Sequence, residues 1–280
     1  MNADGSGYRV IRRFSAVNSA INSFSTDGQQ PGPLAQGPNG LLYGTTACGG
    51  IAHPNGAGTL FALGTNAADY AVIYYFSNSG QEGQAPVAGL TLGRDGSCYG
   101  VTPSGGLSSQ GLIFKINANG GGYNTLHEFG LDGIDGFDPQ GGLMQGFDGM
   151  LYGTTLKGGF GGFSRGTVFK VNPDGSHYTV LLNFGFAGAD WDMNPAAPPV
   201  QGRDGRLYGT SDGGNWDEWG NTYGMVYTLD TNGLNFAALY QLNTNALEGR
   251  APLSGLIQDG EQTHHMHALA CNPTDPLVGL

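Results

Sequence analysis

The chain has 280 residues, of which 52 are glycine and 14 are proline, and its formal net charge is −11. Hydrophobic residues make up 39% of it, which is enough apolar mass to offset the entropy lost on folding, so the glycines are expected to mark turns. The acidic balance argues against nucleic acid and anionic membranes as partners and suits metal cations or neutral small molecules such as sugars and esters.

The cysteines and the N-terminal residues leave the cellular compartment open. Cys48, Cys98 and Cys271 show neither CxxC spacing nor an even count, so neither a zinc site nor a disulfide framework is expected. Residues 1–5 do not resemble a signal peptide. No apolar run approaches the roughly 20 residues that cross a bilayer, so membrane insertion is not expected.

The first ten residues reappear later in the chain. Residues 2–11 match residues 172–181, which lie at the end of a repeated unit. The sequence is therefore expected to open at the final strand of a module.

A Tyr-Gly motif then recurs four times, at tyrosines that lie 56, 53 and 56 residues apart. These tyrosines are Tyr43, Tyr99, Tyr152 and Tyr208. Each follows an Asn-Gly or Asp-Gly pair that fits a two-residue hairpin turn, and each precedes a glycine pair. A β-rich run such as 166–171 comes next, and a second turn leads to an alternating run such as 178–182.

Each module therefore reads as four short strands, and no window sustains the 3.6-residue apolar period of a helix. Four strands in about 55 residues predict one blade of a propeller. We expect an all-β, five-bladed β-propeller with four-stranded antiparallel blades. A linear β-solenoid or a sandwich array is the alternative. The ring would be closed by the N-terminal strand pairing with the C-terminal partial module, which hides the sheet edges.

The expected modules span the whole chain as one domain. Their bounds are about 8–69, 70–122, 123–177, 178–235 and 236–280, with residues 1–14 completing the last blade. The pattern stops after Gly260. Residues 261–280 are either a divergent strand pair or a non-native end.

The third module, Gly142 to Val171, is similar to the bacterial GloVer tandem repeat, and the resemblance covers about residues 8–260. It implies a secreted or cell-surface bacterial protein, which we expect to be a monomer. It implies no catalytic residue. The second module departs from the repeat, with Cys98 in place of leucine and Val101 in place of threonine.

An acidic residue stands shortly before a proline in the link between consecutive modules. These acids are Asp27, Glu82, Asp135, Asp190, Asp192 and Glu248. In a propeller this link and the loop between the second and third strands emerge on one face. Carboxylates gathered there repel unless a cation neutralises them, so the pattern predicts a Ca²⁺ site. The alternative is that each acid caps its own loop through backbone N–H groups.

The loop between the second and third strands differs from module to module. In the fourth module it carries Trp216, Asp217, Glu218, Trp219 and Tyr223, and Trp191 lies in the preceding link. Aromatic side chains among carboxylates suit sugar stacking, and Asp217 or Glu218 could act as general base or acid. The alternative is that the tryptophans pack over the blade.

Other loops are expected to extend the same face. His53 is a further catalytic candidate, and Phe160 and Phe163 are further substrate contacts, although each alone also fits a packing role.

Two functions follow. The first is a calcium-dependent hydrolase of the propeller-lactonase type, in which metal-activated water attacks a lactone, ester or glycosidic bond. The second is a non-catalytic glycan-binding or surface-adhesion propeller, or a repeat scaffold. The sequence leaves this choice open.

Overall fold

The computed structural model describes most of the chain and shows an all-β protein. The described residues are 6–14, 25–50, 56–66, 69–160, 165–184, 194–216, 222–242, 251–252, 254–258, 266–267 and 270–271. Within these ranges the regular elements are strands, which confirms the all-β prediction. The same ranges hold no helix that is long and apolar enough to cross a membrane.

Four antiparallel sheets, called blades 1 to 4 here, follow one another along the chain. Blade 1 has β1 (Gln29–Pro31), β2 (Ala35–Gln36), β3 (Leu42–Cys48), β4 (Thr59–Leu63) and β5 (Ala71–Tyr75). Blade 2 has β7 (Thr91–Leu92), β8 (Ser97–Thr102), β10 (Leu112–Asn117) and β11 (Asn124–Glu128). Blade 3 has β12 (Met144–Gln145), β13 (Leu151–Thr155), β14 (Thr167–Val171) and β15 (Thr179–Asn183). Blade 4 has β16 (Val200–Gln201), β17 (Leu207–Trp216), β18 (Thr222–Leu229) and β19 (Ala237–Gln241).

Three short strand pairs complete the structure. β6 (Gly83–Gln84) pairs with β9 (Ser104–Gly105), β20 (Ala251–Pro252) with β23 (Ala270–Cys271), and β21 (Ile257–Gln258) with β22 (Met266–His267). Within residues 261–280, β22 and β23 thus pair with strands that precede Gly260 in the chain.

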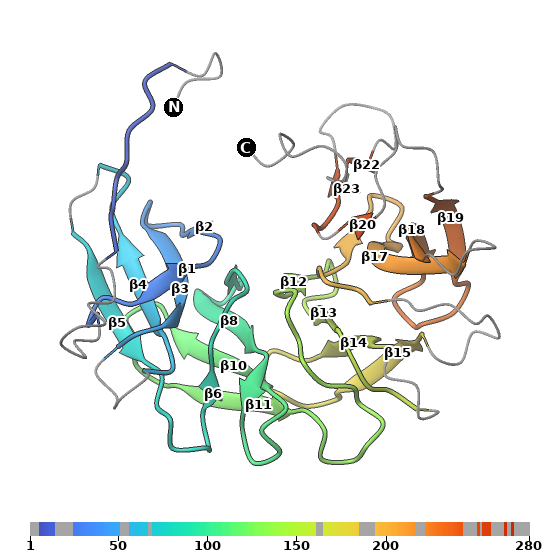
Figure 1. Ribbon diagram of the computed structural model, residues 1–280, viewed down its shortest axis with the longest axis horizontal. Coiled ribbons are helices and arrows are strands. Elements are labelled where there is room, and N and C mark those ends of the chain that lie inside the picture. Colours follow the sequence, from blue (N-terminus) through green and yellow to red (C-terminus); the bar gives the residue numbers. More distant parts are fainter. Residues whose placement is uncertain are drawn as a thin grey trace.

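The blades are arranged in an arc around a central axis, as in a propeller (Figure 1). In blade 3, for example, β12 lies nearest the axis and β15 lies outermost (Figure 1). Residues 6–14 lie on one side of the opening in the arc and the C-terminal strand pairs on the other (Figure 1). Residues 6–14 form no strand, so the expected pairing that would close the ring is not seen there.

The outer, fourth strand of each blade pairs with the third strand of the same blade, which directly precedes it in the chain. β15, for example, pairs with β14 through Lys170 opposite Thr179. Each sheet therefore includes one strand beyond the module boundary expected from the sequence. This strand is the run after the second turn, which pairs with the strand just before that turn.

The repeated Tyr-Gly motif builds a hydrogen-bonded corner at the start of each second strand. In blade 3 the buried Tyr152 hydroxyl donates to Asp148 at 2.7 Å, and Asp148 also accepts from the Met150 N–H at 3.1 Å. Tyr99 and Tyr208 donate to Asp95 and Asp204 in the same way. The turn acid and the tyrosine thus fix each other, which explains why they recur together.

The glycine after this tyrosine makes room for an aromatic ring on the third strand. A Cβ on Gly153 would lie 2.5 Å from the Phe169 ring, closer than real contacts allow. Phe169 is fully buried. The Tyr-Gly and Gly-Thr-Val-Phe segments of a module are therefore two halves of one packing unit.

Consecutive blades meet through the aromatic residue that ends each outer run. Phe129 after β11 packs on Phe169 of blade 3, with ring centroids 5.4 Å apart. Phe76 packs on Phe114 of blade 2 at 5.3 Å, and Phe184 on Tyr227 of blade 4 at 5.4 Å. We call this contact, with the polar groups around it, the module joint.

We predict that Gly153→Ala lowers the free energy of unfolding by about 1–3 kcal/mol, because the added methyl overpacks the core against Phe169. Urea denaturation measures this loss. Gly149→Asn is the matched control: no atom lies within 4 Å of the Cβ position, and asparagine tolerates its φ of +84°. Equal losses in the two variants would contradict the packing role of Gly153.

Candidate functional site

The two loops expected to share a face do lie together. In blade 2 the Gly106 N–H donates to the carbonyl of Glu82 at 3.1 Å. In blade 3 the Phe137 N–H donates to the carbonyl of Lys157 at 2.8 Å. The acidic link between modules is therefore tied directly to the loop between the second and third strands.

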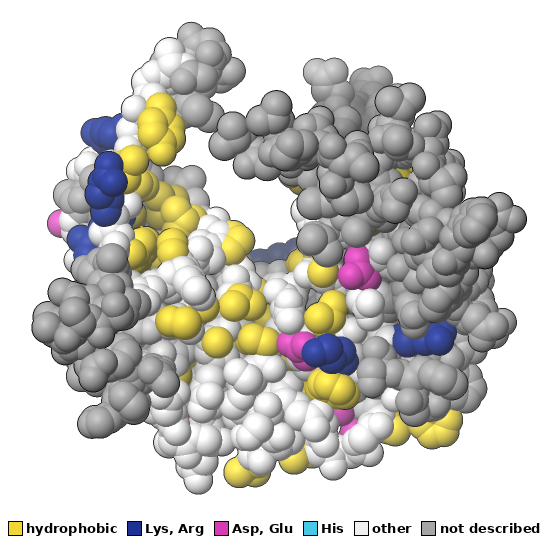
Figure 2. Space-filling model, in the orientation of Figure 1, with side chains coloured by type: hydrophobic (Ala, Val, Ile, Leu, Met, Phe, Trp, Pro, Cys, Tyr) yellow, Lys and Arg dark blue, Asp and Glu magenta, His cyan; other side chains and the backbone are white. Residues whose placement is uncertain are grey.

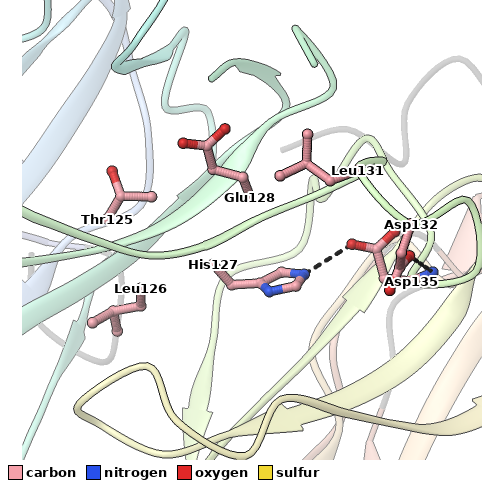
Figure 3. Close-up of a pocket in the computed structure, with 7 residues that line it drawn as sticks. All are labelled: Thr125, Leu126, His127, Glu128, Leu131, Asp132 and Asp135. Atoms are coloured by element: carbon pink, nitrogen blue, oxygen red, sulfur yellow. Dashed lines mark hydrogen bonds and ion pairs between the residues drawn. The ribbon is translucent and has the colours of Figure 1, made fainter. Parts of the chain in front are cut away.

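Asp135 is the most buried of the three predicted metal ligands that the structure describes, with 1% of its surface exposed. Its carboxylate accepts from the Gly130 N–H at 3.0 Å, which closes its own loop. It also accepts from His127 Nε2 at 2.9 Å (Figure 3). The Asp135 carboxylate is thus already hydrogen-bonded on both oxygens.

A second carboxylate stabilises the same loop. Asp132 accepts from the N–H groups of Ile134 and Asp135 at 3.0 and 3.2 Å. Although burial opposes ionisation, these hydrogen bonds hold the pKa of Asp132 below its ordinary value. Both carboxylates line an open cavity of about 410 Å³, together with His127 and Leu131 (Figure 3).

Asp27 and Glu82 occupy equivalent positions with different partners. Asp27 forms an ion pair with Arg12 at 2.6 Å and accepts from the Ser25 hydroxyl. Glu82 accepts from the Ser77 N–H at 3.0 Å, and its charge, after burial, raises the pKa of Tyr74 above its ordinary value. Each described acid therefore pairs with a side chain from the outer run just before it.

The loop-capping alternative is confirmed for Glu82 and Asp135, each of which accepts from a backbone N–H of its own loop. The structure places the acids at separate module joints. In the ranges given above, no three Asp, Glu, His or Cys side chains gather closely enough to hold a metal ion. Asp190, Asp192 and Glu248 lie outside the described residues.

Tyrosines complete the joints. The Tyr178 hydroxyl donates to the Asp135 carbonyl at 2.9 Å, and its ring stacks on His127 with centroids 3.6 Å apart. The Tyr70 hydroxyl donates to the Asp27 carbonyl at 2.8 Å, and Arg12 lies 3.8 Å above its ring. Burial first, then the nearby acid, raises the pKa of Tyr70 to about 12 and that of Tyr178 well above its ordinary value.

Sequence reasoning found the acids but missed the side chains that pair with them. Arg12, Tyr74 and His127 all stand two residues before the phenylalanine that ends an outer run. The amino acid at this position changes from module to module, but its spacing from the phenylalanine is constant. Aligning the ends of the outer runs could have found them, because the place is constant.

The predicted substrate face is described only in part. β17 and β18 form a long hairpin in which Asn215 lies opposite Tyr223 and Trp216 opposite Thr222. Phe160 is 56% exposed, as expected for a surface loop residue. The remaining candidates lie outside the described residues: His53, Phe163, Trp191, Asp217, Glu218 and Trp219.

A cavity of about 310 Å³ lies where the inner segments of four modules converge. Its wall is formed by proline, glycine, alanine, valine and leucine residues, with Thr91 and Gln140 as its polar members. Hydrophobic side chains border the central hollow on this side of the molecule (Figure 2). Among the residues that the structure describes, the wall of this cavity therefore carries no carboxylate.

The sequence over residues 1–194 matches the model of the Gloeobacter/Verrucomicrobia repeat. The chain belongs to this family. The match includes three of the four Tyr-Gly motifs and confirms the resemblance seen in the third module. No curated protein matches this Gloeobacter/Verrucomicrobia repeat chain.

One solved structure similar to this Gloeobacter/Verrucomicrobia repeat chain is described as the crystal structure of a nidogen/laminin complex. It has 16% sequence identity and a TM-score of 0.47. The match covers 73% of this chain and 64% of that chain.

We predict that Asp135→Ala lowers the free energy of unfolding by about 3 kcal/mol, because it leaves the Gly130 N–H and His127 without their buried acceptor. Asp135→Asn is the matched control and should lose less, since its amide oxygen can still accept from Gly130. Urea denaturation compares the two. If both variants unfold like the wild type, Asp135 does not hold the joint.

We predict that stability falls as pH rises above about 10, the ordinary tyrosine pKa. The folded joints raise the pKa of Tyr70 and Tyr178, so the unfolded chain loses these protons first and the stability present below that pH is lost. Melting temperatures from pH 8 to 12 measure the slope. Tyr178→Phe removes one titrating phenol and should melt with a shallower slope; an unchanged slope would contradict the assignment.

Proposed function

We propose that this chain is a non-catalytic recognition module, a five-bladed ring that binds a neutral glycan through the projecting hairpin of blade 4. The observation that carries the proposal is the length of that hairpin. β17 and β18 have 10 and 8 residues, whereas β13 and β14 of blade 3 have 5 each.

The extra length begins where the other blades stop. In blade 3 the second and third strands end at the pair Thr155 and Thr167. In blade 4 the equivalent pair is Ser211 and Met225, after which the register shifts and pairing resumes as far as Trp216 and Thr222. The described strands of this hairpin end at Trp216 and Thr222, and the sequence between them contains Asp217, Glu218 and Trp219. Such aromatic groups suit stacking on sugar rings.

The chemistry of the joints favours binding over catalysis. Asp27, Glu82 and Asp135 each hold a joint together, and their hydrogen bonds occupy oxygens that a metal would need. The axial cavity is walled by uncharged residues. A neutral ligand fits both features and the net charge of −11.

The five-bladed ring is supported by two contacts at the ends of the arc. Thr210 of blade 4 donates to the carbonyl of Ser254 at 3.0 Å, as Thr154 of blade 3 does to the carbonyl of Ala197 at 3.1 Å. Phe14 packs on Phe61 of blade 1 with centroids 5.2 Å apart, as Phe129 does on Phe169. A fifth blade between these ends would therefore find the same joint on each side.

Glycan binding is tested by titrating the protein with oligosaccharides in a calorimeter, a readout that does not depend on the tryptophans. Trp216→Ala with Trp219→Ala should weaken binding roughly tenfold or more. Phe147→Ala is the matched control, because Phe147 is a 61% exposed aromatic residue on the turn between the first and second strands of blade 3. If the double variant binds as well as the wild type, or if no oligosaccharide binds, the hairpin is not the site.

The calcium-dependent hydrolase stays a second prediction, since it rests on acids of which half lie outside the described residues. Its test is a thermal melt after EDTA treatment, repeated with calcium. Calcium about 100-fold above its dissociation constant would add about 2.7 kcal/mol to the stability. The joint geometry leads us to expect no rise. A clear rise, together with calcium-dependent product release from a lactone, ester or glycan, would favour the hydrolase instead.

A further inference from the structure

Blade 4 carries a tyrosine at a core position that the other described blades fill with phenylalanine. Tyr227 lies opposite Gly209, as Phe61, Phe114 and Phe169 lie opposite the glycines of their own Tyr-Gly motifs. Tyr227 is fully buried, and its hydroxyl has no hydrogen-bond partner among the residues that the structure describes. A buried hydroxyl without a partner destabilises the folded blade, because the same group binds water once the chain opens.

The room for this hydroxyl comes from a second exchange. In blade 3 a leucine methyl lies beside the motif glycine, with Leu143 Cδ2 2.9 Å from the Cβ position of Gly153. In blade 4 the residue at the place of Leu143 is Pro199, and the Tyr227 oxygen lies beside Gly209 instead. The exchange keeps the core of blade 4 filled but puts a polar atom into it.

Blade 4 also lacks a hydrogen bond that ties the second strand to the third. In blade 3 the hydroxyls of Thr155 and Thr167 are 2.9 Å apart across the two strands, and the equivalent pair in blade 1 is 2.8 Å apart. In blade 4 the facing residues are Ser211 and Met225. The Ser211 hydroxyl donates to the carbonyl of Gly213 on its own strand at 2.7 Å. The side chains at this place therefore do not link β17 to β18.

Blade 2 departs from the repeat at one of these two places. Leu112 lies opposite Thr102, whose hydroxyl has no hydrogen-bond partner among the described residues. Blade 2 keeps the phenylalanine of the repeat, Phe114. Of the four described blades, blade 4 alone differs at both places.

We propose that the β17–β18 hairpin is a local opening unit, whose two strands separate reversibly while blades 1 and 3 stay closed, and that the Tyr227 hydroxyl favours this opening. The open form hydrates a hydroxyl that the closed form leaves unpaired. Segments that bind ligands belong to the parts of proteins that open most easily. Opening lets the projecting hairpin change its position without unfolding the arc. The proposal concerns this motion and does not rest on glycan binding.

Hydrogen exchange of the native protein without ligand, read by mass spectrometry, tests the proposal. We expect the amides of β17 and β18 to exchange about tenfold faster than those of β13 and β14, or more. Tyr227→Phe removes the unpaired hydroxyl and should slow exchange in β17 and β18 roughly tenfold, with no change in β13 and β14.

Tyr178→Phe is the matched control, because the Tyr178 hydroxyl has a partner. It donates to the carbonyl of Asp135 at 2.9 Å. The same loss of one oxygen should there speed exchange around the joint between blades 2 and 3 rather than slow it. Tyr227→Phe combined with Pro199→Leu restores the pair found in blade 3 and should slow exchange in β17 and β18 at least as much as Tyr227→Phe alone.

Two results would overturn the proposal. Equal exchange in the hairpins of blades 3 and 4 would show that blade 4 does not open first. Unchanged or faster exchange in Tyr227→Phe would show that the hydroxyl does not favour opening. These measurements contain no oligosaccharide, so their failure leaves glycan binding standing, and the calorimetric titration decides that proposal separately.

Discussion

The fold depends on one recurring aromatic contact, the phenylalanine that leaves each outer strand and packs on the third strand of the next blade. Phe76, Phe129 and Phe184 are each at most 1% exposed. A single repeat unit cannot bury its hydrophobic face alone. The joint gives each sheet a shared core with its neighbour, so stability accumulates along the arc as it does in other repeat proteins.

Polar groups then set the angle and spacing of each joint. The acid of the link accepts from its own loop and from the preceding outer run, while a tyrosine hydroxyl donates to the carbonyl of Asp27 or Asp135. Buried carboxylates are tolerated because they are hydrogen-bonded on several sides. This arrangement gives the repeated acids a structural reason to recur in every module.

The acids and aromatic residues that repeat are therefore used to pack the modules together. We infer that segments departing from the repeat serve recognition. The lengthened β17–β18 hairpin departs most clearly within the described blades. We propose that this departure serves ligand binding.

The sequence by itself determined the all-β repeat, the strand count of a module and the turn chemistry. These follow from local rules: Asp-Gly favours one hairpin turn, and the alternation of apolar residues favours strands. It also identified Asp135 and its equivalents, because they recur at a fixed spacing.

Only the tertiary structure decided what those acids do. Whether carboxylates converge on an axis or separate into joints depends on how the modules pack, which no single module encodes. The side chains beside them, Arg12, Tyr74 and His127, belong to the preceding run and differ in chemistry. Contacts between residues of different modules depend on blade orientation, and that orientation is fixed by the aromatic joints.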